Sequence, residues 1–276
     1  MNQTTLTPAA SPTRSTATVV SHPVTLRRAI TAEWIKFRTL RSTLAVLAAS
    51  IVGIIVIALI VAFNTRHLTA KIQPEDLVPS ATLQGYYLGQ LLIGALGVLF
   101  VTGEYSTGMI RSTFAAVPKR RPVLWAKLAV FVAITAVSMI ATCLIAFLAG
   151  QALLSHYRAG YSLGDPGVLR IVIGTGIYLT LVGVIGAMLG WIVRSTPGTL
   201  VAYIALILVL PGIFGNVLGA WGKHVAEFMP SEAGGSFIRS FTEPPSLTRW
   251  TGLAVMVLWA VLGVAVAAFE IRRRDA

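Results

Sequence analysis

Six stretches of about twenty residues in this chain contain no Asp, Glu, Lys or Arg. An α-helix rises about 1.5 Å per residue, so twenty residues cover the roughly 30 Å hydrocarbon core of a bilayer. Only 12% of the residues are charged, whereas soluble proteins carry about a quarter. The sequence therefore predicts an all-α membrane protein with six transmembrane helices. The six stretches are Leu44–Phe63, Gln84–Gly103, Leu128–Leu154, Ile171–Val193, Thr199–Gly219 and Thr251–Phe269.

The charged residues are divided unequally between the two sides of the predicted membrane. The side that holds both chain ends carries fifteen Lys and Arg against four Asp and Glu, and the other side carries seven against six. The two net charges, +11 and +1, make up the +12 of the whole chain. Because basic residues near span ends stay cytoplasmic, we expect both termini inside the cell. The asymmetry indicates membrane topology and attraction to lipid headgroups, not nucleic-acid binding.

We expect one membrane domain over residues 24–276. Residues 1–23, rich in Thr, Ser, Ala and Pro, predict a disordered cytoplasmic tail. Pro211-Gly212 should bend the fifth span, and the sequence leaves open whether segment 211–219 bends or re-enters at the outer face. Glycines four residues apart predict close helix contacts. These pairs are Gly85 with Gly89, Gly186 with Gly190, and Gly215 with Gly219.

The segment Leu26–Arg41, directly before the first span, is predicted to form an amphipathic helix in the membrane interface. Its apolar face consists of Leu26, Ala29, Ile30, Trp34, Phe37 and Leu40. Glu33 lies within that face, where lipid would disfavour a carboxylate. Two explanations stay open for Glu33: an ordinary pair with Lys36 one helical turn away, or a position facing protein, either a partner subunit or the second cytoplasmic segment.

That second segment, Glu104–Lys127, separates the second and third spans. Ser106 or Thr107 is expected to cap a short helix, with Ile110, Phe114 and Val117 on one apolar face. Pro118 should end this helix, and Pro122 should begin the next one. The pattern fits an interfacial loop anchored by positive charge, and it fits equally a docking element for a cytoplasmic protein.

Motifs for catalysis are missing from the sequence. It contains neither the glycine-rich phosphate loop of ATPases nor a His-Glu-x-x-His zinc site. No charged residue lies within a predicted span, so an ion-coupling site is not indicated. The polar residues there, Gln90, Tyr178, Thr180 and Asn216, are typical of hydrogen bonds between helices. We expect no enzyme activity, no metal and no cofactor, and we expect any ATP to be bound by another polypeptide.

Three features resemble the membrane subunits of type-2 ATP-binding-cassette (ABC) exporters, the bacterial permeases that pair with a separate ATPase. The run AEWIKFRTLRST, from Ala32, is similar to the interfacial "elbow" helix of that family. The segment 104–127 resembles its coupling region, and the ending FEIRRRDA resembles the exit of its sixth span. The resemblance covers the chain after residue 24. Gly103 and Met109 depart from the Arg and Thr that many members carry at those positions.

The resemblance implies a permease in the bacterial plasma membrane. Two six-span subunits, identical or different, would form the export pathway, and cytoplasmic ABC ATPases would grip a coupling helix between spans two and three. The coupling residues implied are Glu104, Gly108, Ile110, Arg111, Phe114, Pro118, Arg121 and Lys127, with Ile110 and Phe114 filling a groove of the ATPase. The elbow residues implied are Glu33, Trp34, Lys36, Phe37 and Arg41.

Two alternatives stay open on sequence alone. One is a six-span channel or carrier that works without an ATPase. The other is a membrane anchor or sensor that recruits a soluble partner. The transported substrate cannot be read from these residues.

Overall fold

The computed structural model of the chain describes residues 25–65, 79–116, 121–155, 160–240 and 246–273. Within these ranges the regular structure is entirely helical, and six helical segments are long and apolar enough to cross a membrane. The all-α, six-span prediction is confirmed. The spans are α2 (Arg41–Thr65), η2 with α3 (Pro79–Leu83 and Tyr86–Ser106), α5 (Arg121–Ser155), α6 (Val168–Val193), α7 to α8 (Thr196–Asn216) and α11 (Arg249–Arg273).

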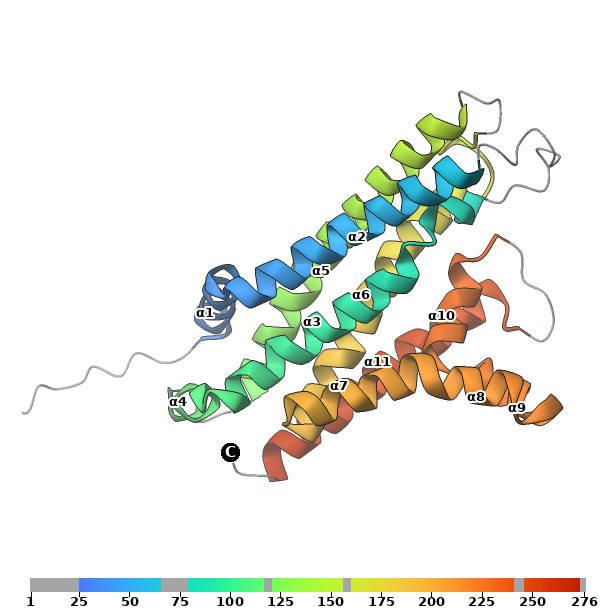
Figure 1. Ribbon diagram of the computed structural model, residues 1–276. Coiled ribbons are helices and arrows are strands. Elements are labelled where there is room, and N and C mark those ends of the chain that lie inside the picture. The colour runs from blue at the N-terminus through green and yellow to red at the C-terminus, as the bar shows by residue number, and fades with distance from the viewer. Residues whose placement is uncertain (1–24, 66–78, 117–120, 156–159, 241–245, 274–276) are drawn as a thin grey trace, which may run out of the picture.

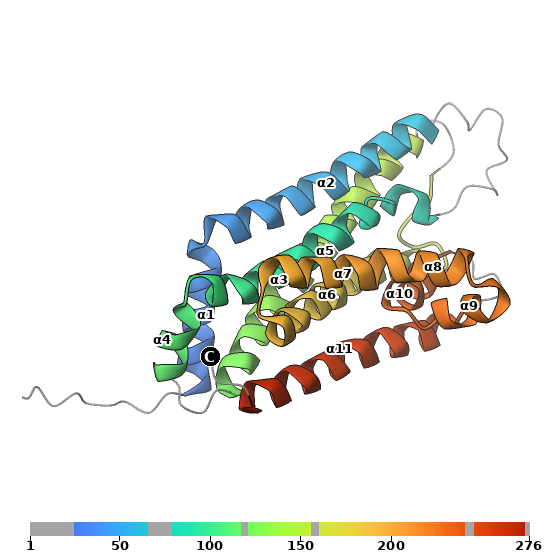
Figure 2. The same ribbon diagram turned by 60° about the horizontal axis from the view of Figure 1, so that its bottom comes forward.

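Helix α6 lies at the centre of the bundle. It packs against α3, α5 and α11, and most of its side chains are buried. In contrast, few residues of α2, the α7–α8 span and α11 are buried, and most are at least partly exposed, as in helices that face lipid. Figures 1 and 2 show α2 and α11 on opposite sides of the bundle, with α3 and α6 between them.

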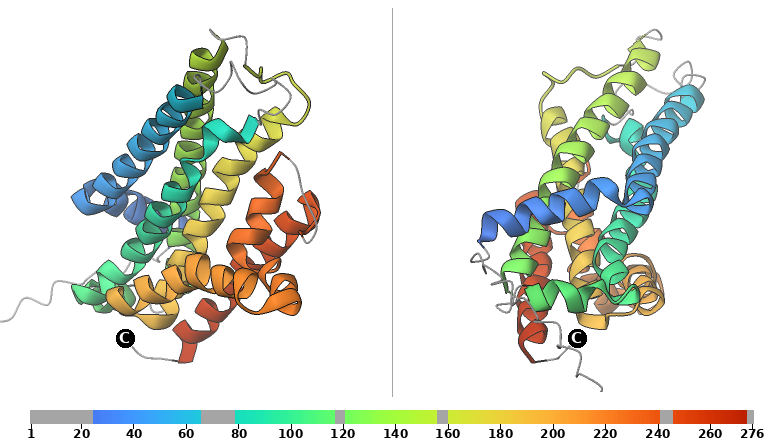
Figure 3. Two further views of the ribbon diagram at one scale, coloured as in Figure 1. Left: turned by 45° about the vertical axis from the view of Figure 1, so that its right-hand side comes forward. Right: turned by 90° about the vertical axis from the view of Figure 1, so that its left-hand side faces the viewer.

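Two short helices lie at the end of the bundle where α11 ends (Figure 1). Helix α1 (Leu26–Thr39) precedes the first span and lies across α5, at a steep angle to the spans (Figure 3). Helix α4 (Met109–Ala116) follows α3. Both therefore form where the amphipathic segments of the sequence predict them. The predicted tail, residues 1–23, lies outside the described residues.

The contact between α3 and α6 brings two backbones together through glycine. A Cβ atom added to Gly97 would lie 2.1 Å from the carbonyl oxygen of Gly183, and one added to Gly186 would lie 2.4 Å from that of Gly94. No side chain fits at such distances. The predicted close contact at Gly186 is confirmed, whereas Gly97 and Gly183 lie outside any four-residue glycine spacing singled out in the sequence.

The other two glycine pairs differ from each other. Gly85 and Gly89 pack against Ile54 of α2, as predicted. The pair Gly215 and Gly219 makes no close helix contact: a Cβ on Gly219 would meet nothing within 4 Å. Gly219 instead has a φ of +67° at the start of α9 (Gly219–Ala226), where the chain reverses direction.

The fifth span contains a break in its α-helical hydrogen bonding. Its first part, α7 (Thr196–Ile204), is followed by a π-helical turn, Ala205–Val209, and by α8 (Leu210–Asn216). Pro211 has no N–H to donate and would collide with the carbonyl four residues earlier. The wider π turn accommodates this proline, so α8 continues to Asn216.

Beyond α8 the chain re-enters the bundle as two short helices, α9 and α10 (Pro230–Ile238). The turn between them reaches the Trp259 indole, whose Nε1 donates to the Phe228 carbonyl at 2.8 Å. Trp259 lies ten residues, about 15 Å, from the N-terminal end of α11. The open question about re-entry is thus resolved: α8 completes the span, and the re-entrant hairpin, residues 219–238, follows it.

We predict that Gly97→Ala destabilises the protein by roughly 1–3 kcal/mol, because the new methyl group would push α3 away from the α6 backbone. The measurement is the thermal unfolding midpoint of the purified chain in maltoside detergent. Gly103→Ala, on the same helix with open space around it, is the matched control and should leave the midpoint unchanged or raise it. Equal losses in both variants would contradict this account of the α3–α6 contact.

Candidate functional site

Four charged side chains form a closed cluster at the end of the bundle that carries α1 and α4. They are Glu33 and Lys36 on α1, Glu104 at the end of α3, and Lys127 in the second turn of α5. Lys36 lies 2.7 Å from Glu33 and 2.8 Å from Glu104, and Lys127 lies 2.7 Å from Glu33 and 2.9 Å from Glu104. Each ammonium thus contacts both carboxylates. We call these four residues the charge quartet.

Three of the four members of the charge quartet are buried. Glu33, Glu104 and Lys127 are each 5% exposed or less. Two positive and two negative charges cancel, which offsets the loss of hydration that burial imposes on each group. The Lys127 ammonium also lies 4.2 Å from the centre of the Phe100 ring, a cation–π contact.

Lys36 remains protonated at neutral pH. Partial burial by itself lowers the pKa of its ammonium, but the carboxylates of Glu33 and Glu104 outweigh burial and raise the pKa above its ordinary value. While Glu33 and Glu104 are ionised, the ion pairs of Lys36 therefore stabilise the fold fully below about pH 10.4, the ordinary lysine pKa, and this contribution is lost as the pH rises through the raised value.

The quartet answers the question that the sequence left open about Glu33. This carboxylate makes the local pair with Lys36, and it also faces protein, since Lys127 belongs to the second cytoplasmic segment. Ala29 and Phe37 are buried on the same face of α1, and Phe37 packs edge-on against Phe100 at 5.3 Å. Trp34 and Leu26, placed on that face by the sequence, are exposed.

The turn between α3 and α4 depends on Gly108, whose φ of +71° few other residues adopt. The hydroxyls of Ser106 and Thr107 donate to the Gly103 carbonyl at 3.0 and 2.8 Å. They therefore close the end of α3. The prediction that one of them caps α4 is wrong, because both hydroxyls point back along the preceding helix.

Helix α4 turns its apolar face inward. Ile110 is 3% exposed and Phe114 is 9% exposed, and the Phe114 ring stacks on Trp191 of α6 at 6.5 Å. The expectation that these two side chains fill a groove of a partner is thereby corrected: the chain's own core occupies that face. The outward face of α4 carries Met109, Arg111, Ser112 and Ala115.

Trp191 connects α4 to a second junction at the same end. It packs edge-on against Tyr105 of α3 at 5.9 Å. Arg194 follows α6 and has a left-handed backbone conformation. Its guanidinium lies 5.6 Å from the Tyr105 ring and donates to the Glu270 carbonyl of α11 at 3.3 Å. Helix α4 is thus in contact with α6 directly and with α11 through Arg194.

The remaining residues implied by the resemblance lie around these two junctions. Arg111 is exposed on α4, Arg121 is exposed at the start of α5, and Arg41 is exposed at the start of α2. Pro118 lies outside the described residues. The structure thus brings Glu33, Lys36, Glu104 and Lys127 into one site and leaves the three arginines at its surface.

The polar residues of the spans were interpreted as links between helices, and two of them form such a link. The Tyr178 hydroxyl of α6 donates to the Gln90 side chain of α3, and the Tyr203 hydroxyl donates to the Gln90 carbonyl at 2.6 Å. Thr180 instead bonds the Gly176 carbonyl of its own helix, and Asn216 bonds that of Gly212.

Sequence reasoning missed a second polar region, at the opposite end of the bundle. Glu232 in the hairpin and Arg239 directly after it lie beside Tyr178. Tyr178 is ten residues from the start of α6. The sequence assigned both charges to an outer connection. Pro230 followed by Glu232 is a helix-start signal that could have indicated α10.

Residues 29–219, well over half of the chain, match the family of ABC-2 transporter proteins. The chain belongs to this family, and the resemblance noted from the elbow and coupling segments is confirmed. With its six apolar helices it is a multi-pass membrane protein, the permease component of an ABC transporter. No match was found among curated proteins.

We predict that Lys127→Met destabilises the protein by about 3–5 kcal/mol, because two buried carboxylates would then share one ammonium. Lys36→Met should cost less, since the Lys36 side chain is 24% exposed. Thermal unfolding midpoints in maltoside detergent measure both effects.

Adding Glu104→Gln to Lys127→Met restores neutrality and should recover part of the lost stability. Arg38→Met, on the exposed face of α1, is the control and should change little. If Arg38→Met were as harmful as Lys127→Met, the charge quartet would not be the stabilising contact.

Proposed function

We propose that this chain is the permease subunit of an ATP-driven exporter. Two six-span subunits, identical or different, form the pathway, and separate cytoplasmic ATPase subunits bind and hydrolyse ATP. The chain itself binds no cofactor. The proposal is supported by membership of the ABC-2 family, whose membrane components work with an ATP-binding subunit.

The observation that carries the proposal is the two-sided character of α4. Its inner face is buried against Trp191, while Met109, at 41% exposure, Arg111 and Ser112 face outward at the end of the bundle. A helix fixed on one side and free on the other is suited to receive a partner. Its surface is apolar and basic, so the partner groove is expected to carry acidic residues.

The contacts of α4 suggest how a movement would reach the spans. The Lys36 ammonium contacts the Thr113 hydroxyl of α4 at 3.5 Å and also belongs to the charge quartet. A displacement of α4 would therefore act on α1, α3 and α5 through the quartet and on α6 through Trp191. ATP shifts this equilibrium only if the ATPase binds one conformation of the permease more tightly than the other.

The orientation follows from the charge distribution. The end of the bundle with α1, α4 and the end of α11 carries the excess of Lys and Arg, so we place it in the cytoplasm together with both termini. In the bacterial plasma membrane, the re-entrant hairpin then lies at the outer face, and transport runs outward.

We predict that the pair of changes Met109→Asp and Arg111→Glu abolishes co-purification of the chain with its ATPase, since both side chains lie on the exposed face of α4. The measurement is the amount of ATPase retained by the tagged chain after detergent extraction. Arg249→Glu, the same substitution as at Arg111 but on an exposed residue at the opposite end of the bundle, is the control. Undiminished retention in the double variant would remove α4 from the docking role.

We predict that a cysteine replacing Ser162, in the turn before α6, reacts with a membrane-impermeant maleimide in intact cells. A cysteine replacing Ser112 on α4 should react only after the cells are opened. Both serines are exposed, and the native Cys143 is buried and should stay unlabelled. The opposite labelling pattern would invert the proposed topology.

A further inference from the structure

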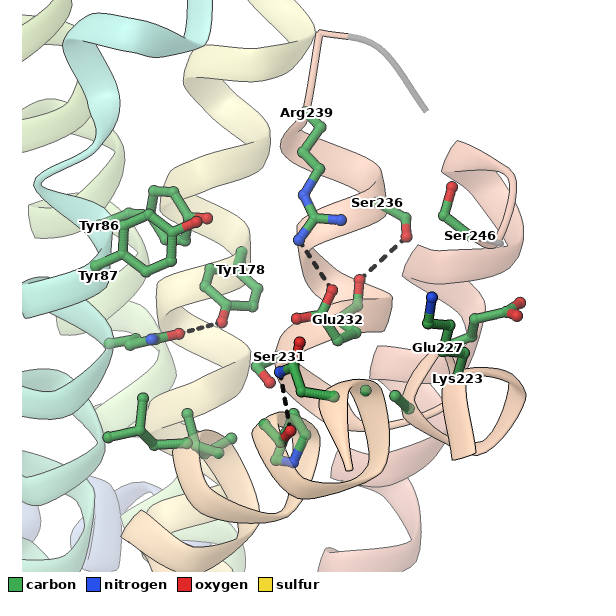
Figure 4. A pocket seen from close by; sticks show the side chains of 18 residues that line it. Tyr86, Tyr87, Tyr178, Lys223, Glu227, Ser231, Glu232, Ser236, Arg239 and Ser246 are labelled. Atoms are coloured by element: carbon green, nitrogen blue, oxygen red, sulfur yellow. Dashed lines mark hydrogen bonds and ion pairs between the residues drawn. The ribbon is translucent and has the colours of Figure 1, made fainter. Parts of the chain in front are cut away.

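The re-entrant hairpin encloses a cavity of about 420 Å³ in the outer half of the bundle. Its walls are the outer ends of α3 and α6 on one side and the hairpin on the other, with α8 as the floor (Figure 4). This volume lies in the range of sites that bind small molecules. Nothing in the proposed docking of an ATPase uses this cavity.

One wall is a fixed aromatic surface. Tyr178 is 1% exposed and is held by its hydrogen bond to Gln90. Tyr86 meets the Tyr178 ring edge-on at 5.9 Å and stacks with Tyr87 at 4.2 Å. These contacts hold the three tyrosines in place before any ligand arrives. Aromatic faces attract cationic groups, quaternary ammonium groups among them.

The opposite wall carries charges of both signs (Figure 4). Glu232 of α10 and Arg239, the residue after this helix, form an ion pair at 2.9 Å. Lys223 of α9 and Glu227, the residue after that helix, also line the cavity, and Glu227 contacts the exposed His224 at 3.0 Å. The four charges sum to zero.

The floor of the cavity is apolar and continues onto an exposed surface. Ile207, Leu208 and Pro211 line it from below. Leu208 is 52% exposed, and Val209 and Ile213 are exposed on the same span. An alkyl chain could therefore leave the cavity along the apolar surface of α8 while its headgroup stays between the two walls.

We propose that this outer cavity binds zwitterionic amphiphiles. The anionic group of the ligand lies against Lys223, its cationic group lies between Glu227 and the tyrosines, and its alkyl chain follows α8. A ligand with one charge only would leave the opposite charges of the cavity uncompensated, whereas a zwitterion matches both. The inference deepens the proposed function, on which it rests, by naming a class of substrate for the permease.

The test compares three probes with the same twelve-carbon chain: dodecylphosphocholine, dodecyl phosphate and dodecyltrimethylammonium. Each is titrated into the full-length chain in maltoside detergent, below its own micelle concentration, and binding is counted by native mass spectrometry. We expect dodecylphosphocholine to bind about tenfold more tightly than either singly charged probe, which corresponds to one charge-assisted contact.

Two substitutions should change the preference in opposite directions. Lys223→Gln should lower dodecylphosphocholine affinity about tenfold and turn the preference toward dodecyltrimethylammonium, while Glu227→Gln should turn it toward dodecyl phosphate. A general disturbance of structure would not reverse its sign between the two variants. Asp165→Asn, a loss of one acid in the turn before α6 and away from the cavity, is the control and should change nothing.

Equal affinity for all three probes, or an unchanged preference in both variants, would overturn the proposal. If one variant fails to fold, the direction in which the other variant changes the binding preference still tests the proposal.

A second measurement separates two sources of the ligand: the chain is extracted from vesicles of phosphatidylethanolamine and phosphatidylglycerol. Selective retention of phosphatidylethanolamine identifies a bilayer lipid. Binding of dodecylphosphocholine alone identifies a soluble amphiphile.

These experiments use the chain without ATPase or nucleotide. A failure to bind zwitterions would therefore leave the exporter assignment standing. Loss of the exporter assignment, through the co-purification test, would in turn leave the binding result unaffected.

Discussion

Backbone contact between α3 and α6 is the constraint on which both ends of the molecule depend. Gly97 and Gly186 have no side chain, so at these two positions the backbones of α3 and α6 approach until only a hydrogen atom fits between them. Each helix then contributes to both regions of interest: α3 carries Glu104 at one end and Gln90 near the other, while α6 carries Trp191 and Tyr178. The helix pair therefore connects the charge quartet with the outer cavity.

The two regions use charge in different ways. At the end that carries α1 and α4, the quartet is closed, since each ammonium contacts both carboxylates and three of its four side chains are buried. At the opposite end, the charges around the outer cavity surround an open space and are only partly paired with each other. In a closed neutral cluster the loss of any one member is costly, because it leaves a buried charge without a partner. The charged side chains around the open cavity are available to bind another molecule.

Much of this arrangement could be predicted from the sequence, because the bilayer dictates it. Span length, amphipathic flanks and the chemistry of Gly108 and Pro122 are local properties, and the six helices, α1 and α4 appear where these properties indicate. The identity of contacts was harder to predict. The burial of Phe114 against Trp191 of α6 depends on a residue nearly eighty positions away, and an apolar helix face looks the same whether its own core or a partner covers it.

The hairpin was missed for a related reason: its short helices have weak patterns, and its depth is set by α6 and α11. This dependence has a consequence for assembly of the protein in the membrane. Helix α10 packs against α6, where Arg170 donates to the Phe237 carbonyl, and against α11, which is synthesised later. The contacts of the hairpin with α11 form only after α11 has been synthesised, so the packing around the outer cavity is incomplete until the final span is in place.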